Sequence, residues 1–209
     1  MIKNIIFDLG GVLITIDQQE AVRRFRELGL ADAEERLNPY TQSGIFGDLE
    51  IGKISAEQFR SSLSELVGHP LTVEDCTHAW LGYHKELPTR NIKMLQQLRA
   101  EGYRLLLLSN TTPFMQSWVE SGNYADGHPL SFYFDALYRS YEVKMMKPDK
   151  AFFQYVLDNE HIRPEETLFV DDGPRNCAAA SMLGIKAFCP INGSDWTQEI
   201  RQYLDKPTA

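Results

Sequence analysis

The sequence is poor in several features that would place it in a specialised class of protein. Its 209 residues include only three cysteines, Cys76, Cys177 and Cys189, which are far apart and form no CxxC pair. This spacing favours neither a disulfide framework nor a zinc site, so we interpret the cysteines as reduced, packed thiols. No run approaches the roughly 20 apolar residues of a membrane span, and the apolar start has no small-residue cleavage site. These absences predict a cytoplasmic protein with no membrane partner.

Positive charge is also scarce. The chain carries 21 Lys and Arg against 29 Asp and Glu, a formal net charge of −8, and no basic cluster. A protein that neutralises a phosphodiester backbone needs such a cluster, so nucleic acid is not an expected partner. The 43% hydrophobic and 24% charged content is typical of a globular protein long enough to bury a large core.

Four short apolar runs bounded by turn residues predict buried parallel strands. They span residues 5–8, 104–109, 167–171 and 185–189. Helical patterns lie between several of them, one ending at Gly102 and one alanine-rich pattern ending at Gly184. Alternating strands and helices predict an α/β fold with a Rossmann-like, doubly wound parallel sheet.

Residues 17–87 contain helical patterns and no run that resembles a buried strand. They contain AVRRFRELGL, SAEQFRSSLSELVG and VEDCTHAWLGYH, which all have helical periodicity. Ser55 and Gln58 have the spacing of a capping box, which predicts a helix start at that point. Because about 70 residues is far longer than an ordinary strand-to-helix connection, we interpret 17–87 as a helical insert and 1–16 with 88–209 as the core domain.

Polar residues end the predicted strands. Asp8, Ser109 and the pair Asp171 and Asp172 occupy these positions, and Lys147 precedes a further helical segment. Ligands of open α/β sheets bind beyond the carboxyl ends of the strands, so these side chains are expected to meet there. Clustered carboxylates repel one another unless a hard divalent cation lies between them, which makes Mg²⁺ the expected cofactor.

Four segments, FDLGGVL, LLLLSNTT, KMMKPDKAFF and LFVDDGPRN, occur in the order of the four motifs of the haloacid dehalogenase superfamily. The chain therefore resembles this superfamily over residues 5–189. The resemblance implies a Rossmann-like core and makes the insert a helical cap domain. The FDLG variant, the small helical insert and the Asp pair resemble the branch that includes α-D-glucose-1-phosphate phosphatases.

The resemblance also implies a role for each motif residue. Asp8 looks like the nucleophile that attacks phosphorus and becomes an aspartyl phosphate, which divides one displacement into two steps. The catalytic candidates are Asp8, Ser109 and Lys147; the phosphate-binding candidates are Ser109, Asn110 and Lys147; the metal candidates are Asp8, the Gly10 carbonyl and Asp172; and the supporting candidates are Asp171 and Asn176.

The sequence departs from the superfamily pattern at Gly10. Most of its phosphatases carry a second aspartate there, which protonates the leaving oxygen and then activates water. Three explanations stay open: a good leaving group such as an anomeric sugar hydroxyl, a replacement acid or positioned water, or poor turnover. The resemblance to the α-D-glucose-1-phosphate phosphatase branch favours the first. General acid–base help contributes about 10²- to 10⁴-fold, so the departure is large in energetic terms.

Substrate choice is expected to reside in the cap. The segment 40–55, YTQSGIFGDLEIGKIS, can supply a loop at the entrance or can be an ordinary connection between helices. The insert aromatics Phe59, Trp80 and Tyr83 are interpreted as core residues, with a substrate cage as the alternative.

These observations predict a Mg²⁺-dependent phosphatase that hydrolyses a small phosphorylated metabolite, with a sugar phosphate as one candidate, as a monomer or small homo-oligomer. The alternatives are a phosphometabolite-binding or regulatory protein with little catalysis and, less favoured, a haloacid dehalogenase, whose metal-free reaction has no use for the Asp pair.

Overall fold

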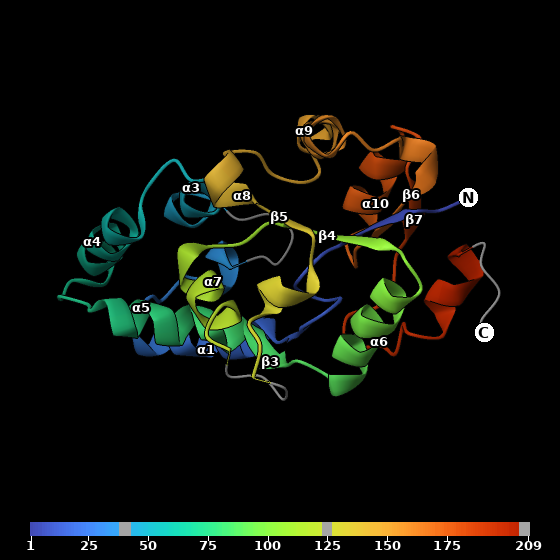
Figure 1. Ribbon diagram of the computed structural model, residues 1–209. Helices are drawn as coiled ribbons and strands as arrows, with labels where there is room; N and C mark the ends of the chain where they lie inside the picture. The colour runs from blue at the N-terminus through green and yellow to red at the C-terminus, as the bar shows by residue number, and fades with distance from the viewer. Residues whose placement is uncertain (38–42, 123–126, 205–209) are drawn as a thin grey trace.

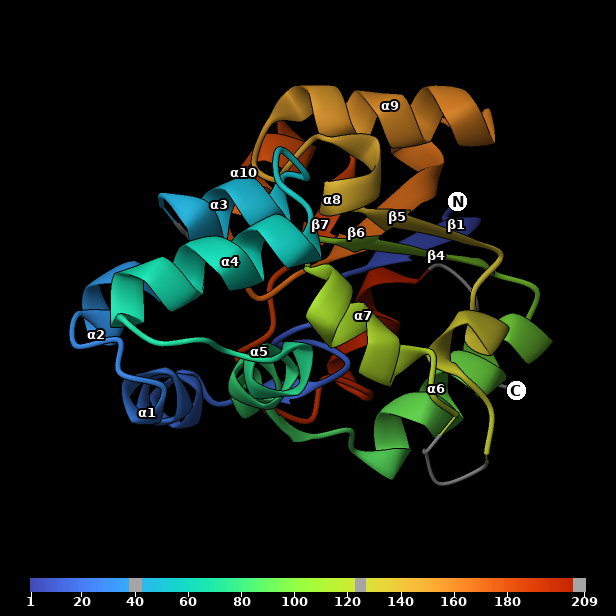
Figure 2. The ribbon, with the colours of Figure 1, turned by 90° about the vertical axis from the view of Figure 1, so that its left-hand side faces the viewer.

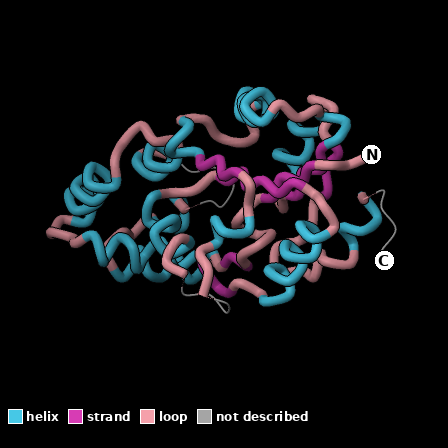
Figure 3. The backbone as a smooth tube through the Cα atoms, in the orientation of Figure 1, coloured by secondary structure: helices cyan, strands magenta, loops and turns pink. Residues whose placement is uncertain are grey.

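The computed structural model describes residues 1–37, 43–122 and 127–204. It contains a five-stranded parallel sheet, whose strands are drawn as arrows in Figure 1 and in magenta in Figure 3. The strand order is β5-β4-β1-β6-β7. The strands are β1 (Asn4–Phe7), β4 (Arg104–Ser109), β5 (Ala136–Arg139), β6 (Thr167–Val170) and β7 (Lys186–Phe188). Because β1 lies in the middle, its carboxyl end is flanked by the ends of β4 and β6.

Helices cover both faces of the sheet (Figure 1). One face packs against α6 (Thr89–Ala100) and the short helix η4 (Glu199–Tyr203), and the other against α9 (Lys150–Glu160) and α10 (Pro174–Ser181). Side chains alternate between faces along a strand, so neighbouring residues of β1 enter different cores. Ile5 and Phe7 belong to the α6 side and Ile6 to the α9 side.

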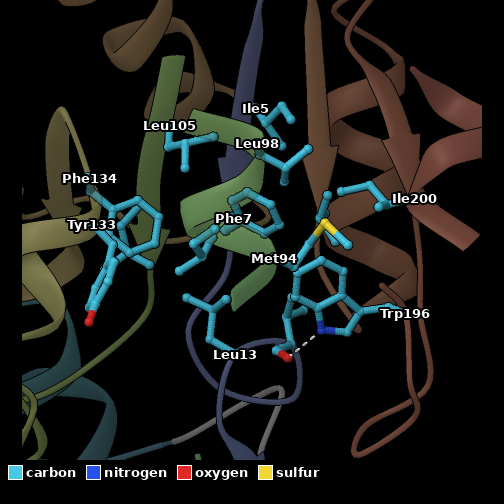
Figure 4. Close-up of a cluster of buried hydrophobic side chains, with 14 of the residues drawn as sticks. Ile5, Phe7, Leu13, Met94, Leu98, Leu105, Tyr133, Phe134, Trp196 and Ile200 are labelled. Atoms are coloured by element: carbon cyan, nitrogen blue, oxygen red, sulfur yellow. Dashed lines mark hydrogen bonds between the residues drawn. The ribbon is translucent and has the colours of Figure 1, made fainter. Parts of the chain in front are cut away.

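A buried tryptophan closes the α6 side of the core (Figure 4). The Trp196 ring lies 5.4 Å from the Phe7 ring, and its indole nitrogen donates a 2.8 Å hydrogen bond to the carbonyl of Val12. A buried indole needs such a partner for its N–H. This contact holds the chain that leaves β1 against the segment that follows β7.

The insert is a group of helices to one side of the sheet (Figure 2). It contains α1 (Gln18–Glu27), α2 (Ala33–Arg36), α3 (Ile45–Glu50), α4 (Ala56–Val67), α5 (Val73–Trp80) and η1 (Leu81–Tyr83). Four aromatic rings, of Phe25, Phe46, Phe59 and Trp80, meet in a separate hydrophobic cluster with centroid distances of 5.2 to 5.8 Å. Phe114 of α7 (Pro113–Val119) joins the same cluster, so the insert is docked on a helix of the core.

A two-stranded antiparallel ribbon forms where the chain enters and leaves the insert. It pairs β2 (Thr15–Ile16) with β3 (His84–Glu86). The side-chain amide of Asn192 completes the ribbon, because it accepts from the Ile16 backbone N–H at 3.0 Å and donates to the Ile16 carbonyl at 3.0 Å. Both chain crossings are thus tied to each other and to the segment after β7.

The predicted α/β fold is confirmed, and most predicted elements are present. The Ser55 and Gln58 capping box opens α4 as expected. The sequence reading missed β5 at the sheet edge and the ribbon of β2 and β3. The remaining elements are α8 (Ser140–Val143), η2 (Leu130–Tyr133) and η3 (Pro164–Glu166). In the described residues no helix is both long and apolar enough to cross a membrane. The proposed division at residues 17 and 87 stays a prediction.

Candidate active site

Strand register brings the predicted acids together. Phe7 of β1 is paired with Val170 of β6, so the residues that follow them, Asp8 and Asp171, emerge side by side at the carboxyl edge of the sheet. One carboxylate oxygen from each of Asp8, Asp171 and Asp172 lies within 4.8 Å of the others. The sequence predicted this juxtaposition from strand ends alone.

Lys147 is the cation that joins this cluster. Its Nζ lies 2.8 Å from Oδ1 of Asp8 and 2.6 Å from Oδ2 of Asp171, and it donates to the carbonyl of Leu108 at 2.9 Å. The Lys147 side chain is 1% exposed. Burial alone lowers the pKa of such an ammonium, but the charges of Asp171 and Asp8 outweigh it and raise the pKa above its ordinary value. Lys147 is therefore a permanent positive charge in the site.

Asp171 is held by donors on both carboxylate oxygens. Oδ1 accepts from the backbone N–H of Gly173 at 2.7 Å and from the Asn176 amide at 2.9 Å, and Oδ2 accepts from Lys147. Its side chain is fully buried. This saturation fits the supporting role predicted for Asp171 and Asn176, because few lone pairs are left for another ligand.

Asp172 lies against the turn that follows β1. Gly11 has φ of +81°, and a Cβ built on it would overlap the Asp172 carboxylate. A side chain at position 11 would thus occupy the space of this acid, a reason for glycine that the sequence reading did not identify. Gly10, the predicted carbonyl ligand, lines the same cavity as Asp8 and Asp172.

Asp8 occupies an electrostatically unbalanced position. Burial raises its pKa to about 8, the Lys147 charge opposes this, and the charges of Asp171 and Asp172 add to it. Three carboxylates share one ammonium, which leaves excess negative charge in a region of little solvent. Oxygen ligands with excess negative charge are the donor set that Mg²⁺ prefers, so Asp8, Asp172 and the Gly10 carbonyl fit the predicted metal.

The loop after β4 supplies the other side of the site. Ser109 is buried at the strand end and lines the cavity beside Asn110. The Asn110 amide donates to the Lys147 carbonyl and accepts from the Lys147 N–H, each at 2.9 Å. The Asn110 side chain therefore positions Lys147.

Ser140, which the sequence reading missed, connects this loop to the insert. Its hydroxyl accepts from the Thr111 N–H at 3.0 Å and lies 2.6 Å from the Glu50 carbonyl. Ser140 is fully buried at the start of α8. One hydroxyl thus fixes the loop after β4 relative to the end of α3.

A cavity of about 270 Å³ is lined by Asp8 and Asp172 and is bounded by residues of both the core and the insert. The core side includes Asp8, Ser109 and Lys147, and the insert side includes Glu50, Trp80 and Tyr83. Trp80 and Tyr83 also contact the insert core, whereas Phe59 belongs to that core alone. The predicted entrance segment 40–55 contributes through Glu50; its residues 40–42 lie outside the described residues.

Glu50 is the cavity residue that the sequence reading passed over. It is 9% exposed, and burial raises its pKa to about 7 against the lowering effect of Lys147. Its spacing in the sequence could have indicated this position, because Phe46, Leu49 and Glu50 lie on the buried face of one helix. Burying a carboxylate is costly, so an acid on such a face indicates a function.

A parallel sheet covered by helices, with an acid cluster and a lysine at its carboxyl edge, is typical of hydrolases with a Rossmann-like fold. The chain belongs to the haloacid dehalogenase-like hydrolases, because the model of that family matches residues 2–184.

Three relatives resemble the chain over nearly its whole length. It is 46% identical to a D-ribitol-5-phosphate phosphatase from Bacteroides thetaiotaomicron, covering 98% of this chain and all of the relative. A HAD-like family hydrolase from Porphyromonas gingivalis is 41% identical with a TM-score of 0.94, over 99% of this chain and all of that chain. The HAD family enzyme BT-2542 from Bacteroides thetaiotaomicron, in complex with magnesium and inorganic phosphate, is 35% identical with a TM-score of 0.88, over 96% of this chain and all of that chain.

Proposed function

We propose that this protein is a Mg²⁺-dependent phosphatase that hydrolyses the phosphate ester of a small sugar or sugar alcohol. The observation that carries the proposal is the contact of Lys147 with Asp8 inside a cavity that also contains Asp172. A nucleophilic carboxylate, a buried cation and a further acid are the parts needed to receive a phosphoryl group.

Asp8 is the proposed nucleophile. Its Oδ1 accepts from Lys147 and from the Leu9 N–H at 2.7 Å, so Oδ2 is the oxygen available for attack on phosphorus. Lys147 and the Ser109 hydroxyl bind the phosphoryl oxygens, and the N–H groups of the loop after β4 add donors. Asn110 acts through the backbone of Lys147.

Asp8, Asp172 and the Gly10 carbonyl would hold Mg²⁺, with Asp171 and Asn176 orienting the acidic loop. The ion would neutralise the carboxylates and the incoming phosphate as a Lewis acid. The support is the excess of three carboxylates over one ammonium and the magnesium complex of BT-2542.

A polyol phosphate is the favoured substrate for two reasons. The relative with 46% identity is a D-ribitol-5-phosphate phosphatase. The insert side of the cavity also includes Trp80 and Tyr83, whose buried indole nitrogen and phenol oxygen have no hydrogen-bond partner among the described residues. An apolar phosphate ester would leave these groups unpaired, which costs about 1–3 kcal/mol each.

We place the insert as a cap over this cavity and the protein in the cytoplasm, as a monomer or small homo-oligomer. Reduced cysteines support the compartment, since Cys76, Cys177 and Cys189 are free thiols. A haloacid dehalogenase reaction needs no metal, so it would not use the Asp171 and Asp172 pair. A protein that only binds a phosphorylated metabolite would not require the contact between Lys147 and Asp8.

The test is a panel of phosphate esters with and without Mg²⁺. We expect phosphate release from pentitol and pentose phosphates and from p-nitrophenyl phosphate, loss of turnover with EDTA, and its recovery with Mg²⁺. Chloride release from a 2-haloacid without metal would select the dehalogenase. Specific binding of a metabolite with no hydrolysis of any ester would select the binding protein.

A further inference from the structure

Position 10 provides no proton for a departing oxygen. Gly10 has no side chain, yet a Cβ built there meets only one atom closely, the Ile16 methyl Cγ2 at 3.2 Å. A Cβ at position 10 would therefore fit after a small shift of that methyl group. An alkoxide leaving from a polyol phosphate is a strong base and needs a proton in the transition state.

Three carboxyl groups line the cavity in the described part of the chain: Asp8, Asp172 and Glu50. Asp8 and Asp172 have the proposed tasks of nucleophile and metal ligand. Glu50 comes from the insert and has neither task. It is the acid of the cavity that the reaction has not yet used.

Glu50 is held in place by contacts between α3 and the core. Ser140 donates to the Glu50 carbonyl at 2.6 Å while its oxygen accepts from Thr111 of the loop after β4. Two residues after Glu50, Gly52 with φ of +71° lies so close to the Tyr141 carbonyl that no Cβ would fit. The end of α3 is thus fixed relative to the loop that would bind the phosphoryl oxygens.

The surroundings of Glu50 favour a carboxyl that exchanges its proton near neutrality. Burial raises its pKa to about 7, and the Lys147 ammonium limits the rise. Tyr83 is its neighbour on the insert side, where burial and then the Glu50 charge raise the pKa of the phenol. An acid with a pKa near the working pH is well suited to donate and regain a proton.

We propose that Glu50 replaces the acid missing at position 10. The inference rests on the proposed function and adds to it the source of the proton.

In the first step an Asp8 oxygen forms a bond to phosphorus, the bond from phosphorus to the ester oxygen breaks, and the Glu50 proton passes to that oxygen, which leaves as an alcohol. In the second step the oxygen of water bonds to phosphorus and the bond to Asp8 breaks. One water proton passes to the Glu50 carboxylate and the other stays on the departing phosphate. Both carboxyl groups return to their starting states.

The experiment measures kcat/KM of Glu50→Gln on aryl phosphates whose phenols differ in acidity, together with D-ribitol 5-phosphate. The ratio kcat/KM reports the first step, in which the proton is donated. We expect a loss of about 10²- to 10⁴-fold with phenyl phosphate and the polyol phosphate. With p-nitrophenyl phosphate, whose leaving group needs no proton, we expect less than about a tenfold loss.

Asp48→Asn is the matched control, because Asp48 lies on the same helix and its side chain is 42% exposed beside Lys53. It should keep the wild-type dependence on leaving group. Circular dichroism and thermal melts of both variants establish that they are folded.

A second variant tests the same idea by gain of function. Gly10→Asp in the Glu50→Gln background places an acid at position 10, where the added Cβ closely approaches only the Ile16 methyl. We expect it to recover at least about tenfold of the activity on phenyl phosphate, within the range of acid–base catalysis.

Two results would overturn the inference. An equal loss across the aryl series shows that Glu50 does not donate the proton. A rise in KM confined to the polyol phosphate, with the aryl series unchanged, makes Glu50 a hydroxyl-binding residue. Inactivity of the wild-type protein on every ester refutes the proposed function itself, a distinct outcome.

Discussion

The ammonium nitrogen of Lys147 lies 2.8 Å from Oδ1 of Asp8, at the carboxyl end of the central strand. This contact directs the carboxylate toward the cavity and leaves its second oxygen available. We therefore expect Asp8→Asn to release no phosphate from p-nitrophenyl phosphate, because an amide cannot form the acyl phosphate. A melting temperature close to that of the wild-type protein would show that chemistry and not folding was lost; undiminished turnover would reject Asp8 as the nucleophile.

Lys147→Met should damage both stability and activity. It leaves Asp8 and Asp171 without their shared cation, and breaking a buried ion pair costs about 3–5 kcal/mol. Urea unfolding followed by tryptophan fluorescence measures the change. Lys150→Met is the control, since Lys150 is exposed at the start of α9 and should change little. Equal stabilities of the two variants would contradict this account.

Gly11→Ala should weaken Mg²⁺ binding by at least about tenfold, because the methyl group would overlap the Asp172 carboxylate. Gly68→Ala is its matched control. Gly68 has nearly the same φ, +80°, but nothing lies within 4 Å of a Cβ there. Both variants should lose about 1 kcal/mol of stability from backbone strain. Only Gly11→Ala should need more Mg²⁺ for half-maximal turnover in a metal titration.

Glu50 should make the protein less stable in alkaline than in acidic solution. Its pKa is raised to about 7 in the folded chain from 4.5, so the folded state binds the extra proton and stability falls as pH rises between these values. A shift of this size corresponds to a cost on the order of 3 kcal/mol above pH 7. Glu50→Gln removes the cost. Thermal melts should therefore show the variant more stable than wild type at pH 8 and similar to it at pH 4.5.

The three thiols should differ sharply in reactivity. Cys189 is exposed, while Cys76 and Cys177 are buried. Burial raises the pKa of Cys76 to about 11, and burial likewise raises the pKa of Cys177, so neither forms the reactive thiolate at neutral pH. A colorimetric thiol reagent should modify one cysteine per native chain quickly and all three in denaturant. Three fast thiols in the native protein would contradict the buried placement.

Sequence patterns predicted the parts of the site that depend on strand ends. Apolar runs placed Asp8, Ser109 and Asp171 at one edge of a parallel sheet, since parallel strands share a direction. The strand β5 was missed because its residues are less uniformly apolar: its burial pattern is mixed, as suits a sheet edge. The residue pattern of a single strand does not show which other strands lie beside it in the sheet.

Contacts between the insert and the core were not predictable in this way. Glu50 and Ser140 are 90 residues apart, and their hydrogen bond depends on how α3 packs against α8. The predicted role of Asn110 in binding phosphate, through backbone or side-chain donors, stays a prediction. The pairing of its side chain with the backbone of Lys147, 37 residues away, depends on the path of the chain. Such pairings arise from tertiary packing, which no periodicity encodes.

The ribbon of β2 and β3 limits how the insert can move. Because both connecting strands are hydrogen-bonded to each other, and Asn192 fixes Ile16 from the core side, the insert has one pivot and not two independent tethers. The Asp17 N–H also donates to the Tyr83 carbonyl at 2.8 Å, so Tyr83, next to β3, is held at the same junction. The ribbon therefore fixes the backbone of one cavity residue, Tyr83, through a hydrogen bond that no substitution of its side chain removes.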